Sequence, residues 1–366
     1  MPESLLINLH RALKAGIGEF AGWITAMDFG DPIKEVLETR NSVTIFDISH
    51  MGRIRLKGKD TYRLLDYLIP KDLTKIGLNM MSGPTAFLNE KAGFKDDVML
   101  YNLGEDEWFI VCNAVNREKI LNWLNNWKVK LGLDVEVIDE TFNMALLALQ
   151  GPKSPEVLEA LGGKDAVDLK IMNFVRNVKL LSKEVFLVSR SGWTGEEVRS
   201  AGYEIMTTPK HAEEIFKKAL ELGAKPAGLI ARDILRLEMG YVLYGEDISE
   251  DINPLEARYW VFSKGKTGYL GYEELRKVMR EGVDKVRVGF RLKKKVRSIP
   301  RHGHKVFIED VEVGYVTSGN FSPTLSRPIA MGYVKSRYAL FGLEVEIDIR
   351  GKRYKAKVVD FPFIKV

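Results

Sequence analysis

Cysteine is almost absent from this chain, which has one, Cys112, among 366 residues. A single cysteine excludes an intramolecular disulfide and any metal cluster held by several cysteines. Long apolar runs are absent as well, because none approaches the ~18 residues that a membrane span needs. The N-terminus carries Glu3 early and has no basic stretch ahead of an apolar core, so it does not look like a signal peptide. We therefore expect a cytoplasmic protein that is not bound to a membrane.

Histidine is also scarce, and its spacing does not suit a metal site. The five histidines are His10, His50, His211, His302 and His304. None belongs to an HExxH pattern. A strand would place His302 and His304 on one face, but two histidines without close acidic partners make a poor metal site. We expect these residues to have structural or surface roles and the protein to hold no metal.

Size and charge are those of an ordinary globular protein. Hydrophobic residues make up 45% of the chain and charged residues 29%. A chain of 366 residues is too long for one compact core, so two or three domains are expected. The net charge of +5 suits an anionic ligand or an acidic partner and is too small to indicate nucleic acid.

The periodicity of apolar residues predicts an α+β fold that ends in an all-β domain. Helical spacing predicts helices over residues 5–15, 32–39, 61–69, 117–131, 210–222 and 231–239, and a further helix that begins at Pro155. We expect Asp60 and Ser154 to cap two of them. Short apolar runs predict strands over residues 43–46, 53–56, 108–112 and 144–149. Six further strands are predicted over residues 286–291, 305–308, 311–317, 329–334, 345–349 and 352–359.

Three segments imitate sites for phosphate groups. Gly16 to Ala21 fits GxGxxA, but it follows a helix where a dinucleotide fingerprint needs a strand. Gly265 to Thr267 imitates the end of a phosphate loop, but Trp260 occupies the position of the first glycine. The basic stretch from Arg291 to Arg301 could grip phosphates, although a solvated strand edge is favoured. We therefore expect no nucleotide cofactor.

The adjacent pair Asp96 and Asp97 is the first candidate for chemistry, since it lies between a glycine-containing loop and an apolar strand. Neighbouring strand residues point to opposite faces. One carboxylate can then face a pocket while the other caps a backbone segment or meets solvent. Two ordinary turn aspartates are the alternative that the pair by itself leaves open.

Several motifs in a fixed order resemble the aminomethyltransferase of the glycine cleavage system, the T-protein. They are FAGW at 20–23, FDISHMG at 46–52, NEKAGFKDD at 89–97, SRSGWTGE at 189–196 with GYE at 202–204, PAGLIARD at 226–233 with RLE at 236–238, and TSGNFSPTL at 317–325. The resemblance extends roughly from Phe20 to Val334. The last motif is expected to be a loop that shapes or closes the site.

The resemblance implies a fold and a reaction. The fold is a three-domain cloverleaf, with a discontinuous folate-binding α+β domain over residues 1–52 and 140–275, a second α+β domain over 53–139, a C-terminal β-barrel over 280–366, and folate in a central channel. The reaction moves the methylene of an aminomethyl-lipoyl carrier protein, the H-protein, to tetrahydrofolate with release of ammonia. Tetrahydrofolate is the acceptor substrate, and neither nucleic acid nor membrane is an expected partner.

The resemblance also implies the residues of the site. Asp97 is the catalytic residue, which orients the pterin and helps to move protons. The residues expected to contact folate are Met51, Asp97, Asn113, Trp193, Glu204, Arg232 and Tyr241. Asp96 is expected to point away, so that Asp96→Asn leaves turnover within a few-fold.

Two of these assignments have competitors. An ionised Glu204 can accept both N–H donors of the pterin edge. About four extra residues near 198–201 make Glu196 its competitor for this role. Arg232 could instead be a structural arginine paired with Asp233 or Glu238.

Departures from the family pattern keep other functions open. The usual Gly-Gly before the aspartate pair is Ala92-Gly93, an expected aromatic is Pro84, and the C-terminal Pro-Phe-aromatic is 362–364, Pro-Phe-Ile. One alternative is a folate-dependent demethylase of a methylated amine or sulfonium compound. Another is a folate-binding factor in iron–sulfur maintenance or RNA modification, whose K-G-C-Y-x-G-Q motif here lacks the cysteine. A third is a non-catalytic folate-binding module. The sequence makes no prediction of the oligomeric state.

Overall fold

The computed structural model describes residues 1–365, which form two compact units. The first unit contains residues 1–87, 96–232 and 262–269. The second contains residues 88–95, 233–261 and the chain from Leu270 onward. Both units are therefore discontinuous in sequence.

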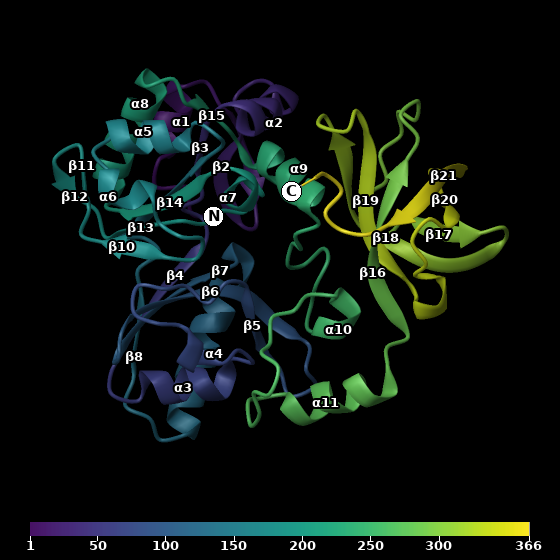
Figure 1. Ribbon diagram of the computed structural model, residues 1–366, viewed down its shortest axis with the longest axis horizontal. Helices are drawn as coiled ribbons and strands as arrows, with labels where there is room; N and C mark the ends of the chain where they lie inside the picture. Colours follow the sequence, from purple (N-terminus) through teal and green to yellow (C-terminus); the bar gives the residue numbers. More distant parts are fainter. Residues whose placement is uncertain (366) are drawn as a thin grey trace. The chain divides into compact units, whose positions relative to one another are not determined.

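The first unit contains a six-stranded sheet with helices packed on it (Figure 1). Its strand order is β10 (Phe174–Arg176), β13 (Leu187–Ser189), β14 (Gly202–Thr207), β9 (Ala145–Gln150), β3 (Thr44–Asp47) and β15 (Lys225–Pro226). The helices α1 (Ile7–Ala12), α5 (Ser154–Ala160) and α8 (Pro209–Glu221) contribute side chains to the same buried apolar core as β9 and β14. Both β9 and β14 are buried along their whole length, which explains the apolar run Ala145–Leu149 in β9; in β14 the buried residues include Glu204.

A second sheet, most of whose residues belong to the first unit, has five strands. Its order is β5 (Thr85–Leu88), β6 (Phe94–Gly104), β7 (Glu107–Cys112), β4 (Gly52–Lys57) and β8 (Glu136–Asp139). The helices α3 (Thr61–Leu68) and α4 (Arg117–Lys130) bury apolar faces that include Leu64 and Leu124. The β6–β7 hairpin pairs Val98 with Cys112. This register brings the aspartate pair opposite the short helix η2 (Ala114–Asn116) that follows β7.

The second unit contains a closed six-stranded barrel, visible in green and yellow in Figure 1. Around the barrel the strands are β16 (Lys285–Leu292), β19 (Arg327–Lys335), β18 (Val311–Ser322), β17 (Lys305–Ile308), β20 (Glu344–Ile349) and β21 (Lys352–Val359). Alternating apolar residues such as Val288, Phe290 and Val316 fill its interior. The predicted C-terminal β-barrel is confirmed, as is the mixed α+β class.

The remaining elements are short connections and helices. They are β1 (Gly16–Phe20), β2 (Trp23–Asp28), α2 (Pro32–Asn41), η1 (Leu73–Lys75), α6 (Lys164–Val167), β11 (Lys179–Leu180), β12 (Lys183–Glu184), α7 (Glu196–Arg199), α9 (Leu229–Met239), α10 (Pro254–Ala257), α11 (Tyr272–Glu281) and η3 (Ser336–Tyr338). The GxGxxA segment lies in the β1–β2 hairpin, with no helix after it, which agrees with its rejection as a dinucleotide site.

Three local predictions are wrong. Asp60 precedes α3 but makes no side-chain cap, because its carboxylate accepts from the Asp134 N–H at 2.9 Å. Ser154 lies inside α5 after the N-cap Lys153, and its buried hydroxyl has no partner among the described residues. The segment Thr317 to Ser322 is strand, not loop.

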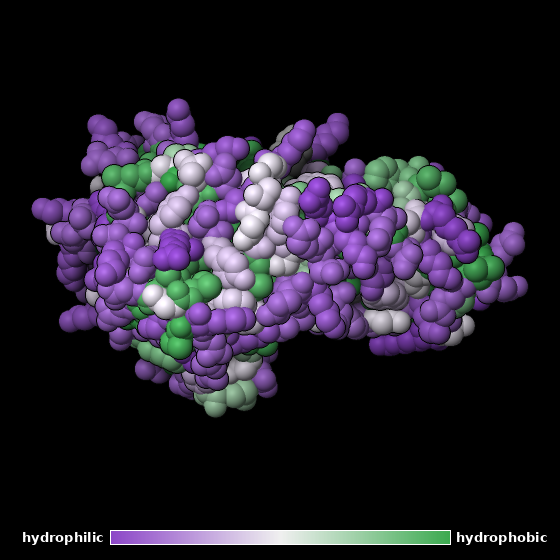
Figure 2. Space-filling view, turned by 90° about the horizontal axis from the view of Figure 1, so that it is seen from below, coloured by the Kyte–Doolittle hydropathy of each residue, from purple (hydrophilic) through white to green (hydrophobic). Residues whose placement is uncertain are grey.

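One face of the molecule illustrates the character of the surface. Figure 2 shows one face that is mostly covered by hydrophilic side chains, with separate smaller hydrophobic areas. Within residues 1–365, no helix combines the length and the apolarity that a membrane crossing requires.

Candidate active site

Two adjacent carboxylates, Asp96 and Asp97, meet at one amide group. Asn113 Nδ2 donates to Asp97 Oδ1 at 2.7 Å and to Asp96 Oδ1 at 2.9 Å. Asn116 Nδ2 donates to Asp96 Oδ1 at 2.6 Å, and the Asn113 backbone N–H donates to Asp96 Oδ2 at 3.0 Å. Asp96 therefore accepts a backbone N–H, as expected, but it does not meet solvent: it is fully buried and shares a donor with Asp97.

The surroundings of Asp96 favour a bound proton. Burial, followed by the charge of Asp97, raises the pKa of Asp96 well above its ordinary value, although the amides of Asn116 and Asn113 oppose this shift. Two carboxylates this close titrate as a pair. The pair therefore takes up a proton more readily than two isolated aspartates would.

A second carboxylate, Glu204, lies on β14 with its own hydrogen-bond network. Its Oε2 accepts from Ser191 Oγ at 2.9 Å and from the Tyr101 hydroxyl at 3.4 Å. Burial raises the pKa of Glu204, while the charge of Arg232 and these hydroxyl donors lower it. The sequence did not single out Tyr101 or Ser191. Tyr101 could have been found, because it lies four residues after Asp97 in β6 and strand periodicity puts both on one face.

Glu196, the alternative to Glu204 as the pterin-binding carboxylate, is engaged in ion pairs. Two of the extra residues, Val198 and Arg199, lie in α7, whose first residue, Glu196, is buried. Its carboxylate pairs with Arg40 at 2.8 Å and with Arg199 at 2.6 Å, and it accepts from the Ser200 hydroxyl. This geometry favours Glu204 over Glu196 as the group available to a ligand.

Arg232 lies within electrostatic reach of two carboxylates of the first unit. Burial lowers the pKa of Arg232, and the charges of Glu204 and Glu197 oppose that shift. The salt bridge to Asp233 belongs instead to Arg236, which also pairs with Asp247 at 2.7 Å. Arg232 is half-buried, and its charge is offset by Glu204, the residue expected near it in the site, and by Glu197.

The SHMG segment places His50 and Met51 after β3. Met51 is half-buried, and its carbonyl accepts from the Arg53 guanidinium. His50 is 2% exposed, its Nδ1 has no hydrogen-bond partner among the described residues, and the Phe20 ring lies edge-on at 5.4 Å. Burial lowers the pKa of His50 to about 3; the charge of Arg232 adds to this effect and that of Asp47 opposes it. His50 is therefore neutral at ordinary pH.

This burial predicts an acid-sensitive fold. Between the ordinary pKa of 6.5 and about 3, the unfolded chain binds a proton at His50 and the folded chain does not. The free energy of unfolding should therefore fall by about 1.4 kcal/mol per pH unit in this range from His50 alone. Between pH 7 and pH 5, wild type should lose about 2 kcal/mol more than His50→Gln, measured by denaturant unfolding. His302→Gln, at an exposed position, should behave like wild type. The same pH dependence in wild type and His50→Gln would contradict this account.

Trp193 and Tyr241 complete the predicted set. Trp193 is half-buried in the segment before α7, within the first unit. Tyr241 belongs to the second unit, where its carbonyl accepts from Arg236 at 3.0 Å. In the first unit the structure thus brings Asp97 to Asn113 and Glu204 near Arg232. Tyr101 lies on β6 together with Asp97, and its hydroxyl donates to Glu204.

The TSGNFSPTL motif has a structural role in the second unit. Thr317 and Ser318 donate to the buried Asp247, and Arg236 Nη2 lies 2.9 Å from Ser318 Oγ. Ser322 Oγ donates to Glu238 at 2.6 Å. These bonds attach β18 to α9, and residues 317–322 are strand where a loop was expected.

The left-handed turn before the aspartate pair explains one departure from the family pattern. Ala92, where the family usually has glycine, has φ 63°. A Cβ on the following Gly93 would lie 1.8 Å from the Glu250 carbonyl oxygen, so this position requires glycine. Alanine thus occupies the left-handed position here, and the glycine that follows it is required by the close approach of Glu250.

Two further observations concern other kinds of site. Within residues 1–365, no group of three or more His, Cys, Asp or Glu side chains is placed to hold a metal ion.

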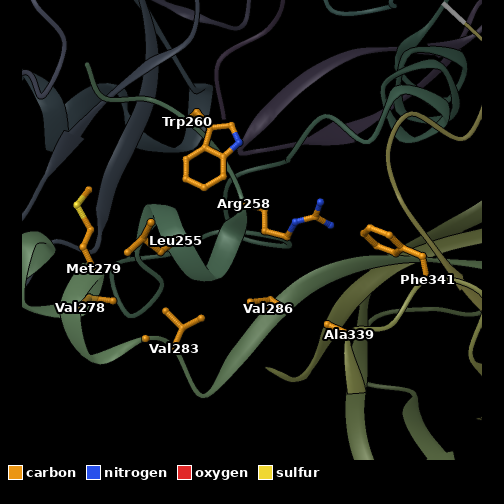
Figure 3. A pocket seen from close by; sticks show the side chains of 10 residues that line it. Leu255, Arg258, Trp260, Val278, Met279, Val283, Val286, Ala339 and Phe341 are labelled. Atoms are coloured by element: carbon orange, nitrogen blue, oxygen red, sulfur yellow. The ribbon is translucent and has the colours of Figure 1, made fainter. Parts of the chain in front are cut away.

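The second unit has an apolar groove of about 480 Å³ (Figure 3). Its lining residues are Leu255, Arg258, Trp260, Val278, Met279, Gly282, Val283, Val286, Ala339 and Phe341. None of the predicted site residues lines this groove.

Comparison with known proteins defines the class of this fold and site. The profile of the GCVT N-terminal domain matches residues 6–266, and that of the glycine cleavage T-protein C-terminal barrel domain matches residues 285–365. The solved glycine cleavage system aminomethyltransferase T from Bartonella henselae superposes with a TM-score of 0.91 at 32% identity, covering 99% of this chain and 98% of that one.

Curated relatives agree over the full length. The chain is 45% identical to a probable aminomethyltransferase from Aeropyrum pernix, over 98% of this chain and 97% of that protein. It is 39% identical to an aminomethyltransferase from a Thermoanaerobacter species, over 100% and 98% of the two chains. The chain belongs to the glycine cleavage T-protein family, a family of aminomethyltransferase enzymes.

Proposed function

We propose that this enzyme moves the methylene of an aminomethyl group, carried as a thioaminal on the lipoyl arm of an H-protein, to tetrahydrofolate. Ammonia leaves, the carbon becomes the methylene of methylenetetrahydrofolate, and the lipoyl arm is left as the dithiol. The observation that carries the proposal is that two carboxylates, Asp97 and Glu204, both lie in hydrogen-bond networks that include residues of β6. Asp97 with Asn113 lies at one end of β6, and Tyr101 on the same strand reaches Glu204.

The proposed roles of Glu204 and Asp97 follow from the surroundings of each carboxylate. Glu204 accepts the adjacent N–H donors of the pterin edge, and Arg232 stabilises its negative charge in a buried position. Asp97 is 8% exposed, so its carboxylate can reach a ligand while Asn113 holds it in place. It orients the reacting nitrogens of folate and moves a proton as the carbon transfers. Met51, Trp193 and Tyr241 complete the folate contacts in this proposal.

The domain division expected from the resemblance forms part of the proposal. The six-stranded sheet would belong to the folate-binding domain of residues 1–52 and 140–275, the five-stranded sheet to residues 53–139, and the barrel to residues 280–366. Folate would lie in a central channel. A cytoplasmic location fits a small soluble acceptor and a carrier partner.

Ammonia release tests the function directly. Wild-type protein should release ammonia from aminomethylated, lipoylated H-protein, and tetrahydrofolate should increase the rate strongly. Sarcosine, dimethylglycine and a sulfonium donor, tested in place of the carrier, should not be consumed and should give neither methyltetrahydrofolate nor methylenetetrahydrofolate. Folate-dependent consumption of one of these donors, with none of the carrier, would replace the proposal with the demethylase alternative. Tetrahydrofolate binding without turnover of any donor would leave a non-catalytic folate-binding module.

Partner binding should depend on salt. Residues 285–365 contain eighteen Lys and Arg against seven Asp and Glu, although the whole chain has a net charge of only +5. The basic stretch from Arg291 to Arg301 includes exposed Lys293, Lys294 and Lys295. If it docks the lipoyl carrier, the dissociation constant should rise about tenfold or more between 50 and 300 mM salt.

Titration calorimetry with matched variants measures this effect. Replacing Lys293, Lys294 and Lys295 together by Ser should weaken binding and flatten the salt dependence. The control replaces three exposed lysines elsewhere, Lys34, Lys59 and Lys217, and should retain both properties. A dissociation constant that does not change with salt would remove the basic stretch from the proposed interface. An equal loss of affinity in the two triple variants would do the same.

A further inference from the structure

We propose that Asp96 is a positioning residue for the carboxylate of Asp97 and acts through the side-chain amide of Asn113. The inference rests on the proposed function, because it assigns Asp97 the reacting role. It replaces the expectation that Asp96 points away and can become Asn with little effect on turnover.

The amide of Asn113 connects the two carboxylates. An amide nitrogen carries two hydrogens in a fixed plane. Here it lies 2.9 Å from Asp96 Oδ1 and 2.7 Å from Asp97 Oδ1, with the Asp97 carbonyl at 3.1 Å. When Asp96 holds one N–H, the direction of the other is set, and that direction is toward Asp97.

Asp96 is anchored independently of Asp97. Its Oδ1 also accepts from Asn116 Nδ2 at 2.6 Å, and its Oδ2 accepts from the Asn113 backbone N–H at 3.0 Å. These donors come from the segment that follows β7, across the hairpin from β6. Asp96 is 0% exposed, whereas Asp97 is 8% exposed. Asp96 therefore cannot touch a substrate and can act only through its neighbours.

The acceptor pattern makes Asp96 difficult to replace. Both oxygens accept from N–H donors, two at Oδ1 and one at Oδ2. An asparagine at this position must point its own NH₂ group at one of these sites, whichever way its amide is turned. Two donors then face each other in a buried place, which costs the full penalty of unsatisfied groups. The Asn113 amide should move in response and release Asp97 from its position.

Steady-state kinetics of the full-length enzyme tests the inference with wild type, Asp96→Asn, Asp97→Asn and the double variant. We expect Asp96→Asn to lower kcat about tenfold or more, since small displacements of a reacting group are costly. The KM for tetrahydrofolate should stay within about threefold of wild type. If Asp96 acts through Asp97, the double variant should be no slower than Asp97→Asn alone.

Three outcomes would overturn the assignment. Wild-type kcat in Asp96→Asn would mean that Asp97 needs no such support. Losses that multiply in the double variant would mean that Asp96 acts independently of Asp97. A wild type without turnover of the carrier substrate would reject the proposed function itself, whereas the first two outcomes reject only the role of Asp96.

A milder variant covers the case in which Asp96→Asn does not fold. Asn116→Leu is nearly isosteric and removes one donor from Asp96 without touching Asp97. It should lower kcat several-fold at unchanged KM. Asn125→Leu is the matched control, because Asn125 lies in α4 and its side-chain amide donates to the Leu121 carbonyl at 2.9 Å. Equal activity of the two leucine variants would also overturn the inference.

Discussion

Asp97→Asn should reduce turnover by about 10²-fold or more while the protein stays folded and still binds tetrahydrofolate. Asparagine keeps the size of the side chain and an oxygen that can accept from Asn113, so the local packing should survive. It removes the negative charge and the basicity that a positioned acid–base group contributes. Rate loss with an unchanged melting temperature and folate affinity would locate the effect in the chemical step.

The matched control for this experiment is Asp106→Asn. Asp106 lies in the turn of the same β6–β7 hairpin with an exposed side chain, so its replacement should leave turnover unchanged. Ammonia release in single-turnover experiments with tetrahydrofolate separates chemistry from product release. Normal turnover in Asp97→Asn would show that the aspartate pair supports the hairpin and takes no part in the reaction.

Glu204→Ala should weaken tetrahydrofolate binding by about 1.5–3 kcal/mol, the range for a hydrogen bond to a charged group. The side chain is 9% exposed and its carboxylate is held by Ser191 and Tyr101, so little reorganisation is needed when the pterin binds. The exposed Glu184→Ala provides the control and should bind folate as wild type does. Calorimetry gives the affinity, and circular dichroism checks that each variant is folded.

A distinct result would follow if the assignment were wrong. Unchanged affinity in Glu204→Ala would reopen the role for Glu196. In that case Glu196→Gln should weaken binding, despite its ion pairs with Arg40 and Arg199. If neither variant changed the affinity, folate would have to be held elsewhere.

Elements with strong periodicity were predictable from the sequence, and those that depend on distant partners were not. The strands β17 and β21 and the helix α4 lie within a residue of their predicted bounds, because apolar spacing and turn residues act locally. Asp60 has the right residue type and place for a helix cap. Its carboxylate is taken instead by the Asp134 N–H, which is 74 residues away in the sequence.

The candidate site shows the same division. Motif order identified the family and pointed to Asp97, Asn113, Glu204 and Arg232. It did not indicate that Asp96 and Asp97 share the Asn113 amide, because that depends on the hairpin register and on the turn into η2. Nor did it reveal the bond from Tyr101 to Glu204, which joins strands of two different sheets.

The sequence by itself therefore determined the fold class, the C-terminal barrel and the family, since all of these are carried by local patterns and by residue types in order. The tertiary structure decided which carboxylates are buried, which donors they share and which of two glutamates is already neutralised. These properties arise from desolvation and from contacts between segments that lie far apart in the chain. Burial of His50 and the pairing of Glu196 with Arg40 are of this kind, because neither can be inferred before the strands and helices that enclose them are packed.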